Sequence, residues 1–227
     1  MARTLNPAAH ALRRDAFIDV AARLIQTRGY EQLSVEEILS ELDASKGAFY
    51  HYFDSKEALL EAVVDRVSDA AAAALAPIVD DPGLSAVAKL EALFRGLAQW
   101  KNARHDLMLG LLEVWLSDDN TVVREKVRCE VATRFGPLLA VIVRQGEQEA
   151  IFTATSPEPT AQVIVSILQG LQEAAARLFL ARQKGLATRR DVEEVIFAYT
   201  EALERVLGTP PGSLRLVDDD TMRIWFG

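Results

Sequence analysis

Apolar residues recur every three to four positions along most of the chain, which is the spacing of one face of an α-helix. The first such stretch begins near Pro7 or near Ala11 and is expected to end at Gly29. Its apolar stripe consists of Phe17, Val20, Ala21, Leu24 and Ile25. No run of alternating Val, Ile or Thr predicts a strand. We therefore expect an all-α fold.

Two short helical segments joined by a break follow this first helix. Ser34 is expected to cap the first of them, with Glu37 as the partner in a capping box. The break falls at Asp43 and Ala44, because Asp tolerates turn geometry. The buried stripe of this segment is predicted to comprise Val35, Ile38, Leu39 and Leu42.

The second short segment is predicted to begin after a capping Ser45. Phe49 and Phe53 lie four residues apart and are expected to point inward. The residues left for the outside are Lys46, Gly47, Ala48, Tyr50 and His51. A further helix would then be capped by Asp54, with Glu57 as its box partner. Two short helices and a tight turn form the pattern of a helix-turn-helix.

Five more helices and a loop account for the part of the chain beyond the apparent linker at residues 80–83. The predicted helices are Ser85–Lys101, Asp106–Leu116, Thr121–Gly146, Thr160–Gln183 and Asp191–Leu207, the third with a kink at Gly136 and Pro137. The loop is predicted at Phe152–Pro159, and the chain after Thr209 is read as a tail. We expect one domain over residues 1–60, whose fourth helix links onward to about residue 80, and a second over residues 61–227.

Composition narrows the class of protein. Half of the 227 residues are hydrophobic and the net charge is −8. The first sixty residues hold seven Lys and Arg against nine Asp and Glu, so bulk charge does not favour nucleic-acid binding. One cysteine fits a reducing cytoplasm, and neither a signal peptide nor a membrane-spanning run is expected. No catalytic motif occurs and the three histidines lack metal spacing, so catalytic residues, metals and cofactors are not expected.

The segment from Arg13 to Leu60 resembles the tetracycline-repressor (TetR) family of bacterial transcription regulators. The residues that carry the resemblance are Ala21, Gly29, Tyr30, Ser34, Val35, Ile38, Ser45, Lys46, Gly47, Phe49, Tyr50, Phe53 and Ser55–Leu59. The departures are Asp43 where Gly is usual, Tyr52 where His is common, and the acidic Glu36. The resemblance implies an N-terminal helix-turn-helix DNA-binding domain and a C-terminal helical domain that binds a small molecule and forms a homodimer.

Four of the candidate DNA-binding residues suit the phosphate backbone. The hydroxyls of Ser34 and Ser45 lie at helix starts, where phosphate oxygens bind well, although capping alone explains both. The phenol of Tyr50 would reach the backbone. Lys56 lies in the first turn of a helix, where the dipole disfavours a cation, and a phosphate opposite would account for it.

The other four candidates suit base edges in the major groove. Lys46 is expected to read a guanine, while Gly47 and Ala48 permit close approach and can meet a thymine methyl. His51 could touch a phosphate or a base. Arg13 and Arg14 could add phosphate contacts, and His10 and His105 are read as surface residues.

The second domain offers candidate residues for an effector and for a dimer. The candidate effector-binding residues are Phe94, Trp100, Met108, Leu112, Trp115, Cys129 and Phe135, all of which ordinary core packing would also explain. The candidate dimer residues are Ile164, Ile167, Leu171, Leu178, Val195 and Tyr199, which completion of a monomer's core would explain equally. Gly170 suggests close packing of its helix on another.

The resulting hypothesis is a ligand-responsive transcription regulator. It would be a dimeric repressor released from a palindromic double-stranded DNA operator by a small apolar or aromatic molecule. The alternatives left open are a transcriptional activator and a non-sensing interaction or DNA-organising protein on the same scaffold. An enzyme is disfavoured because no constellation of residues calls for one.

Overall fold

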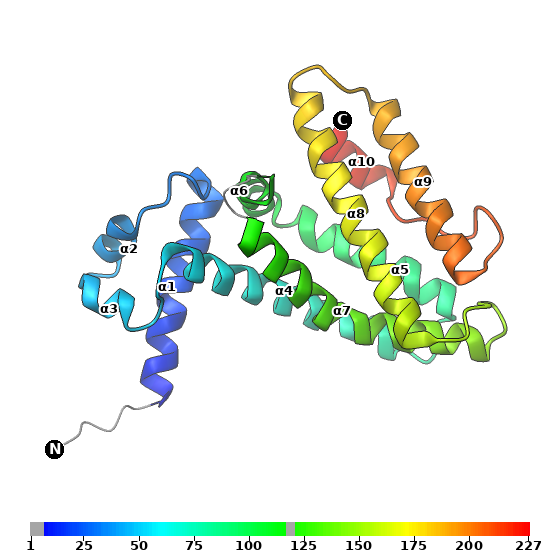
Figure 1. Cartoon of the computed structure of the whole chain (residues 1–227), viewed down its shortest axis with the longest axis horizontal. Helices are drawn as coiled ribbons and strands as arrows, with labels where there is room; N and C mark the ends of the chain where they lie inside the picture. Colours follow the sequence, from blue (N-terminus) through cyan, green and yellow to red (C-terminus); the bar gives the residue numbers. More distant parts are fainter. Residues whose placement is uncertain (1–6, 117–120) are drawn as a thin grey trace. The chain divides into compact units, whose positions relative to one another are not determined.

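The computed structural model describes residues 7–116 and 121–227, apart from the side chains of residues 113–115, 122 and 123. Every regular element in these ranges is a helix, so the predicted all-α fold is confirmed (Figure 1). The helices are α1 (Pro7–Arg28), α2 (Val35–Glu41), α3 (Lys46–Tyr50), α4 (Lys56–Asp80), α5 (Ala86–Asn102), α6 (His105–Leu116), α7 (Thr121–Gln148), α8 (Pro157–Gln183), α9 (Arg189–Leu207) and α10 (Asp219–Phe226).

The chain divides into two compact units. The first comprises residues 1–67 and 104–127, and the second comprises residues 68–103 and 128–227. The boundaries fall inside α4 and α7, so each of these helices contributes residues to both units.

The core of the first unit forms around the apolar stripe of α1. All five residues predicted for that stripe are buried, as are the predicted inward residues Phe49 and Phe53. The ring of Phe17 lies 5.8 Å from that of Phe49 and 6.2 Å from that of Phe53, edge to face in both pairs. Helix α6 packs closely on α1 at Gly110, where a Cβ atom would lie only 2.3 Å from the carbonyl oxygen of Ile25.

The second unit is organised around the pairing of α8 with α9, which run side by side in Figure 1. Gly170 of α8 faces Tyr199 of α9 so closely that a Cβ atom would lie 2.9 Å from the tyrosine hydroxyl oxygen. The close helix packing expected at Gly170 is therefore confirmed. The α8 residues Ile164 and Leu171 are buried in the same core.

The segment predicted to be a tail contains a tenth helix. Asp218 caps α10 by accepting from the backbone N–H of Thr221 at 2.8 Å. The indole N–H of Trp225 donates to Asn102 of α5 at 2.6 Å, and its ring lies 6.1 Å from that of Phe179 in α8. Because α10 is tied to two other helices of the second unit, this segment is part of the fold.

Helix α8 departs from the prediction in two further respects. It begins at Pro157 and not at Thr160, because proline suits the first turn of a helix. It is also, within the described part of the chain, the one helix long and apolar enough by composition to cross a membrane, whereas the sequence was read as having none. Ala161, Ile164, Val165 and Leu171 of this helix belong to the core of the second unit, and a helix that covers a core can have this same composition.

Candidate nucleic-acid interface

The two short helices are defined by serine caps and by one residue of unusual conformation. Ser34 accepts from the backbone N–H of Glu37 at 3.2 Å, and Ser45 accepts from that of Ala48, also at 3.2 Å. Between the helices Asp43 has a φ of 45°, a left-handed conformation that Asp tolerates better than most residues. The predicted break at Asp43 and both serine caps are thus confirmed.

The predicted capping boxes are wrong at both positions. The carboxylate of Glu37 accepts from Arg28 of α1 and does not return to its own helix start. Helix α4 is capped by Ser55, whose hydroxyl oxygen accepts from the N–H of Ala58 at 3.2 Å, and not by Asp54. A hydrogen bond with Ser55 is also the main cause that lowers the pKa of Glu57.

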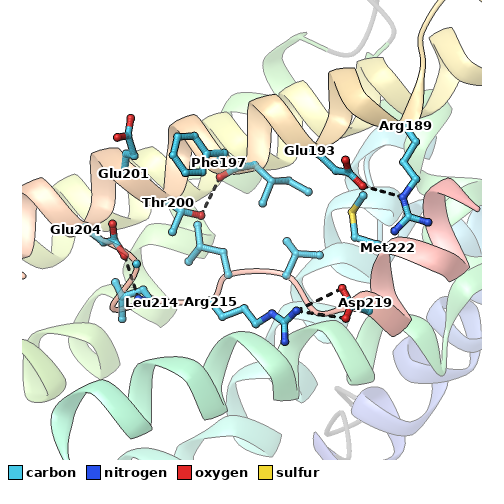
Figure 2. Close-up of a pocket in the computed structure, with 14 residues that line it drawn as sticks. Arg189, Glu193, Phe197, Thr200, Glu201, Glu204, Leu214, Arg215, Asp219 and Met222 are labelled. Carbon is cyan, nitrogen blue, oxygen red and sulfur yellow. Dashed lines mark hydrogen bonds and ion pairs between the residues drawn. The ribbon is translucent and has the colours of Figure 1, made fainter. Parts of the chain in front are cut away.

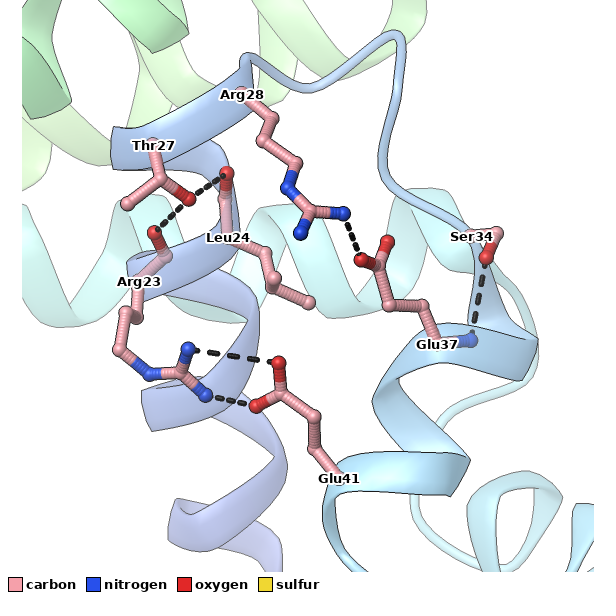
Figure 3. A network of polar contacts seen from close by, with 7 residues as sticks. All are labelled: Arg23, Leu24, Thr27, Arg28, Ser34, Glu37 and Glu41. Carbon is pink, nitrogen blue, oxygen red and sulfur yellow. Dashed lines mark hydrogen bonds and ion pairs between the residues drawn. The ribbon is translucent and has the colours of Figure 1, made fainter.

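Two ion pairs join α2 to α1 (Figure 3). Arg28 pairs with Glu37, and Arg23 pairs with Glu41 one turn further along α2. Such exposed pairs contribute about 0–1 kcal/mol each, so most of the anchoring of α2 comes from the fully buried Ile38.

The outer face of α3 carries the side chains predicted to point away from the core. Lys46, Gly47 and His51 are exposed, Ala48 is half-buried, and the Tyr50 side chain is 48% exposed. The ring of Tyr50 lies edge-on to the buried Phe49 at 5.3 Å. The outward orientation is confirmed, while contact with DNA stays a prediction.

Lys46 has an acidic neighbour from the preceding helix. Its ammonium nitrogen lies 3.8 Å from a carboxylate oxygen of Glu36, and the two side chains are 65% and 75% exposed. The sequence did not indicate this ion pair, because it depends on how α2 crosses α3.

Lys56 has a structural reason for its place in the first turn of α4. Its ammonium nitrogen lies 4.1 Å from the centre of the Tyr30 ring, a cation–π contact. The hydroxyl of Tyr30 is buried and has no hydrogen-bond partner among the described residues, and burial is the first cause that raises its pKa. The helix-dipole mismatch therefore does not by itself indicate a phosphate at Lys56.

Residues of α1 also contact the helix-turn-helix formed by α2 and α3. His10, interpreted from the sequence as a surface residue, is half-buried and packs against His51 and Tyr52, with ring centres 5.4 and 4.6 Å away. Arg13 donates to the carbonyl oxygen of Leu42 at 3.1 Å and thereby braces the end of α2. Arg14 lies over the ring of Phe53 at 5.2 Å. The side chains of Arg13 and Arg14 thus have partners within the first unit.

The candidate effector residues are distributed over both units. Met108 and Leu112 are half-buried in the first unit, and Trp115 lies outside the described side chains. In the second unit Phe94 is buried in the core, Phe135 packs against it, Trp100 is half-buried and Cys129 is exposed.

A pocket of about 380 Å³ lies between α9 and the segment from Gly212 to Met222 (Figure 2). It is lined by apolar side chains and by the ion pairs Arg189–Glu193 and Arg215–Asp219. None of the seven predicted effector residues lines it.

The prediction for the dimer surface is wrong for Ile164 and Leu171, which are buried in the core of their own chain. Val195 and Tyr199 pack against this core, Leu178 packs against the cluster around α10, and Ile167 is half-buried. The physical reason is that the most apolar stripe of each helix covers the core first. The exposed large apolar side chains of α8 and α9 are Val163 and Phe197, which are 46% and 65% exposed.

Potential metal ligands are dispersed. No group of three or more His, Cys, Asp or Glu residues within residues 7–116 and 121–227 could hold a metal ion.

Comparisons with known proteins agree with the helix-turn-helix. Residues 17–63 match the model of a family described as bacterial regulatory proteins, tetR family. The HTH-type transcriptional regulator YuxN of Bacillus subtilis is 48% identical over 52 residues, which are 23% of this chain and only 18% of YuxN. The HTH-type transcriptional repressor DhaR of Mycobacterium sp. is 22% identical over 190 residues, 84% of this chain and 91% of DhaR.

Solved structures share this fold. A TetR transcription regulator from Haloarcula marismortui superposes with a TM-score of 0.61 at 19% identity, covering 87% of this chain and 97% of that one. At this identity the likeness concerns the fold alone.

Proposed function

Since the chain belongs to the TetR family of helix-turn-helix transcriptional regulators, which are not enzymes, we propose that it is a dimeric repressor whose hold on operator DNA is released by a small molecule. In this proposal residues 1–60 bind DNA and residues 61–227 sense the effector and form the dimer. The repressor assignment is supported by the printed name of DhaR, the relative that aligns over most of its length.

The observation that carries the DNA-binding role is the outer face of α3. Its polar side chains Lys46, Tyr50 and His51 project away from a core built by Phe49 and Phe53. A helix held in this way can enter a major groove, where side chains reach base edges and flanking groups reach phosphates. The proposed DNA-binding residues are Ser34, Ser45, Lys46, Gly47, Ala48, Tyr50, His51 and Lys56.

The acidic composition affects the salt dependence and the specificity of the proposed DNA binding. With few cations on this face, the salt dependence should be modest, because each phosphate neutralised contributes a slope of about −0.9 in log K against log salt. Sequence-independent affinity should be correspondingly weak. Specific binding then depends on local fit and on two copies of α3 reaching half-sites about 34–36 Å apart.

The proposed dimer uses the outer faces of α8 and α9 in place of the buried stripe. Phe197 is the largest exposed apolar side chain on these helices, and Val163 adds to the same kind of surface. Replacing Phe197 by Glu should convert a dimer to a monomer in size-exclusion chromatography with light scattering. The Phe197 side chain is 65% exposed, so the variant should keep its helical content.

The effector is proposed to be a small apolar or aromatic molecule that binds the second domain. Its binding would change the separation of the two DNA-binding units, so that they no longer match the two half-sites. A thermal-shift screen of the full chain, followed by release of bound DNA, identifies such a molecule.

The decisive experiment is a footprint of the full-length protein on the DNA that flanks its own gene, at low salt and without effector. We expect protection of a palindrome, and Lys46→Ala should weaken binding while Lys184→Ala, which removes an exposed lysine at the end of α8, should not. Absence of any protected palindrome under these conditions would overturn the proposal.

A further inference from the structure

Glu36 and Lys46 present opposite charges side by side on the face proposed to enter DNA. The carboxylate and ammonium are 3.8 Å apart, and both side chains extend into solvent. Glu36 comes from the first turn of α2, and Lys46 is the first residue of α3. The pair therefore combines an acceptor and a donor from two helices at one point of the surface.

A carboxylate at this point is unfavourable unless it meets a hydrogen-bond donor. It is repelled by the phosphates, and removal from water is costly for any charge left without a partner. Its contribution to the stability of α2 is replaceable, because Glu37 also places an acid in that first turn and Ser34 already caps the helix. In the major groove the donors are the amino groups of cytosine and adenine.

Cytosine fits the Glu36–Lys46 pair better than adenine does. Adenine carries the N7 acceptor next to its amino group, which would repel a carboxylate, whereas the cytosine edge offers the N4 donor and no acceptor. The guanine paired with that cytosine supplies O6 and N7 to a lysine. The cytosine N4 and guanine O6 atoms are hydrogen-bonded, about 2.9 Å apart, which is close to the 3.8 Å that separates the two side-chain charges.

We propose that Glu36 and Lys46 together read one C·G base pair in each half-site, with Glu36 accepting from cytosine N4 and Lys46 donating to the paired guanine. Glu36 is then a specificity-determining residue. The inference rests on the proposed DNA-binding function. It explains why an acid stands next to the exposed lysine on the outer face of α3.

The test compares full-length wild type with Glu36→Ala and Glu36→Gln. A binding sequence is first selected by the wild-type protein from a random duplex library. Affinities are then measured for that duplex and for duplexes in which one base pair at a time is replaced by each of the other three. Glu61→Ala serves as the matched control, because it removes an ion-paired carboxylate from the first unit at the pair with Lys126.

We expect the wild type and Glu61→Ala to prefer C·G at one position of each half-site by about tenfold or more over the other pairs. In Glu36→Ala this preference should fall to about twofold or less, with preferences elsewhere unchanged. Glu36→Gln keeps the shape but carries its own donor, so it should accept an additional base pair at that position alone. Circular dichroism verifies that each variant is folded.

Two results would overturn the inference while leaving the DNA-binding function intact. One is a Glu36→Ala protein that binds every duplex more tightly with all preferences unchanged, which would make Glu36 only a repulsive charge. The other is a wild-type site without a C·G pair that responds to Glu36. If the wild type selects no sequence at all, the proposed function itself fails, which is a distinct outcome.

Discussion

Replacing Gly110 in α6 by alanine would place a methyl group against the backbone of α1. The new Cβ atom would lie 2.3 Å from the carbonyl oxygen of Ile25, 3.0 Å from its carbonyl carbon and 3.1 Å from its side chain. Backbone atoms inside a helix cannot swing aside as the end of a long side chain can. The clash is therefore relieved only if α6 moves away from α1 by about 1 Å.

Two effects of opposite sign determine the size of the change. Gly to Ala in a helix interior stabilises by about 1 kcal/mol through backbone entropy. Overpacking of a close contact costs about 1–3 kcal/mol, and a gap of this size weakens neighbouring contacts along the interface. Since the obstruction is backbone, the steric effect should prevail and leave a net destabilisation of about 1–2 kcal/mol.

Gly47→Ala is the matched control. Its Cβ atom would meet only the hydroxyl of Ser45 at 3.9 Å, so the same substitution there should stabilise by about 0.5–1 kcal/mol. Urea unfolding followed by circular dichroism gives both values from the transition midpoints at constant m. If Gly110→Ala proved as stable as the wild type or more so, the close contact between α6 and α1 would be refuted.

Three further substitutions test other features of the molecule. Ser45→Ala removes the cap of α3 and should lower the free energy of unfolding by about 1 kcal/mol in the same urea assay; an unchanged midpoint would contradict the cap. Tyr30→Phe removes a buried hydroxyl that has no partner in the described part of the chain, and it should be neutral or stabilising by about 1 kcal/mol, so a clear loss in melting temperature would show that the hydroxyl is bonded. Lys101 is half-buried and its ammonium donates to Gln172 at 3.4 Å. Burial lowers the pKa of Lys101 to about 8, below its value in the unfolded chain, so the folded protein is penalised for the ammonium below pH 8 and this penalty fades as the pH rises towards 10.5. At pH 7 the Lys101→Met protein should therefore have a free energy of unfolding higher than that of the wild type by on the order of 1 kcal/mol, and this difference should shrink by pH 10. A difference independent of pH would contradict the pKa shift.

Most of the helical framework was predictable because its signals are local. The stripe of α1, the inward Phe49 and Phe53, the turn at Asp43 and the caps at Ser34 and Ser45 depend on residues within a few positions of one another. Helix α10 was missed for the opposite reason. Its eight residues are held by partners far away in the sequence, such as Asn102 and Val192, which spacing within the segment does not reveal.

The same distinction applies to side-chain partners. Glu37 fits the spacing of a capping box, yet its carboxylate binds Arg28, because α1 passes within reach. Ile164 and Leu171 were correctly identified as apolar helix positions, but their stripe covers the chain's own core and not a second copy. A periodic pattern indicates that a face is covered and says nothing about what covers it.

The sequence by itself determined the helical class, the helix-turn-helix and the outward direction of Lys46, Tyr50 and His51. Those follow from helical periodicity, capping and turn chemistry, which act over three to four residues. Only the tertiary structure decided that Lys46 meets Glu36, that Lys56 rests on Tyr30 and that His10 joins His51. These contacts depend on the angles at which helices cross, and crossing angles are set by packing across the whole unit.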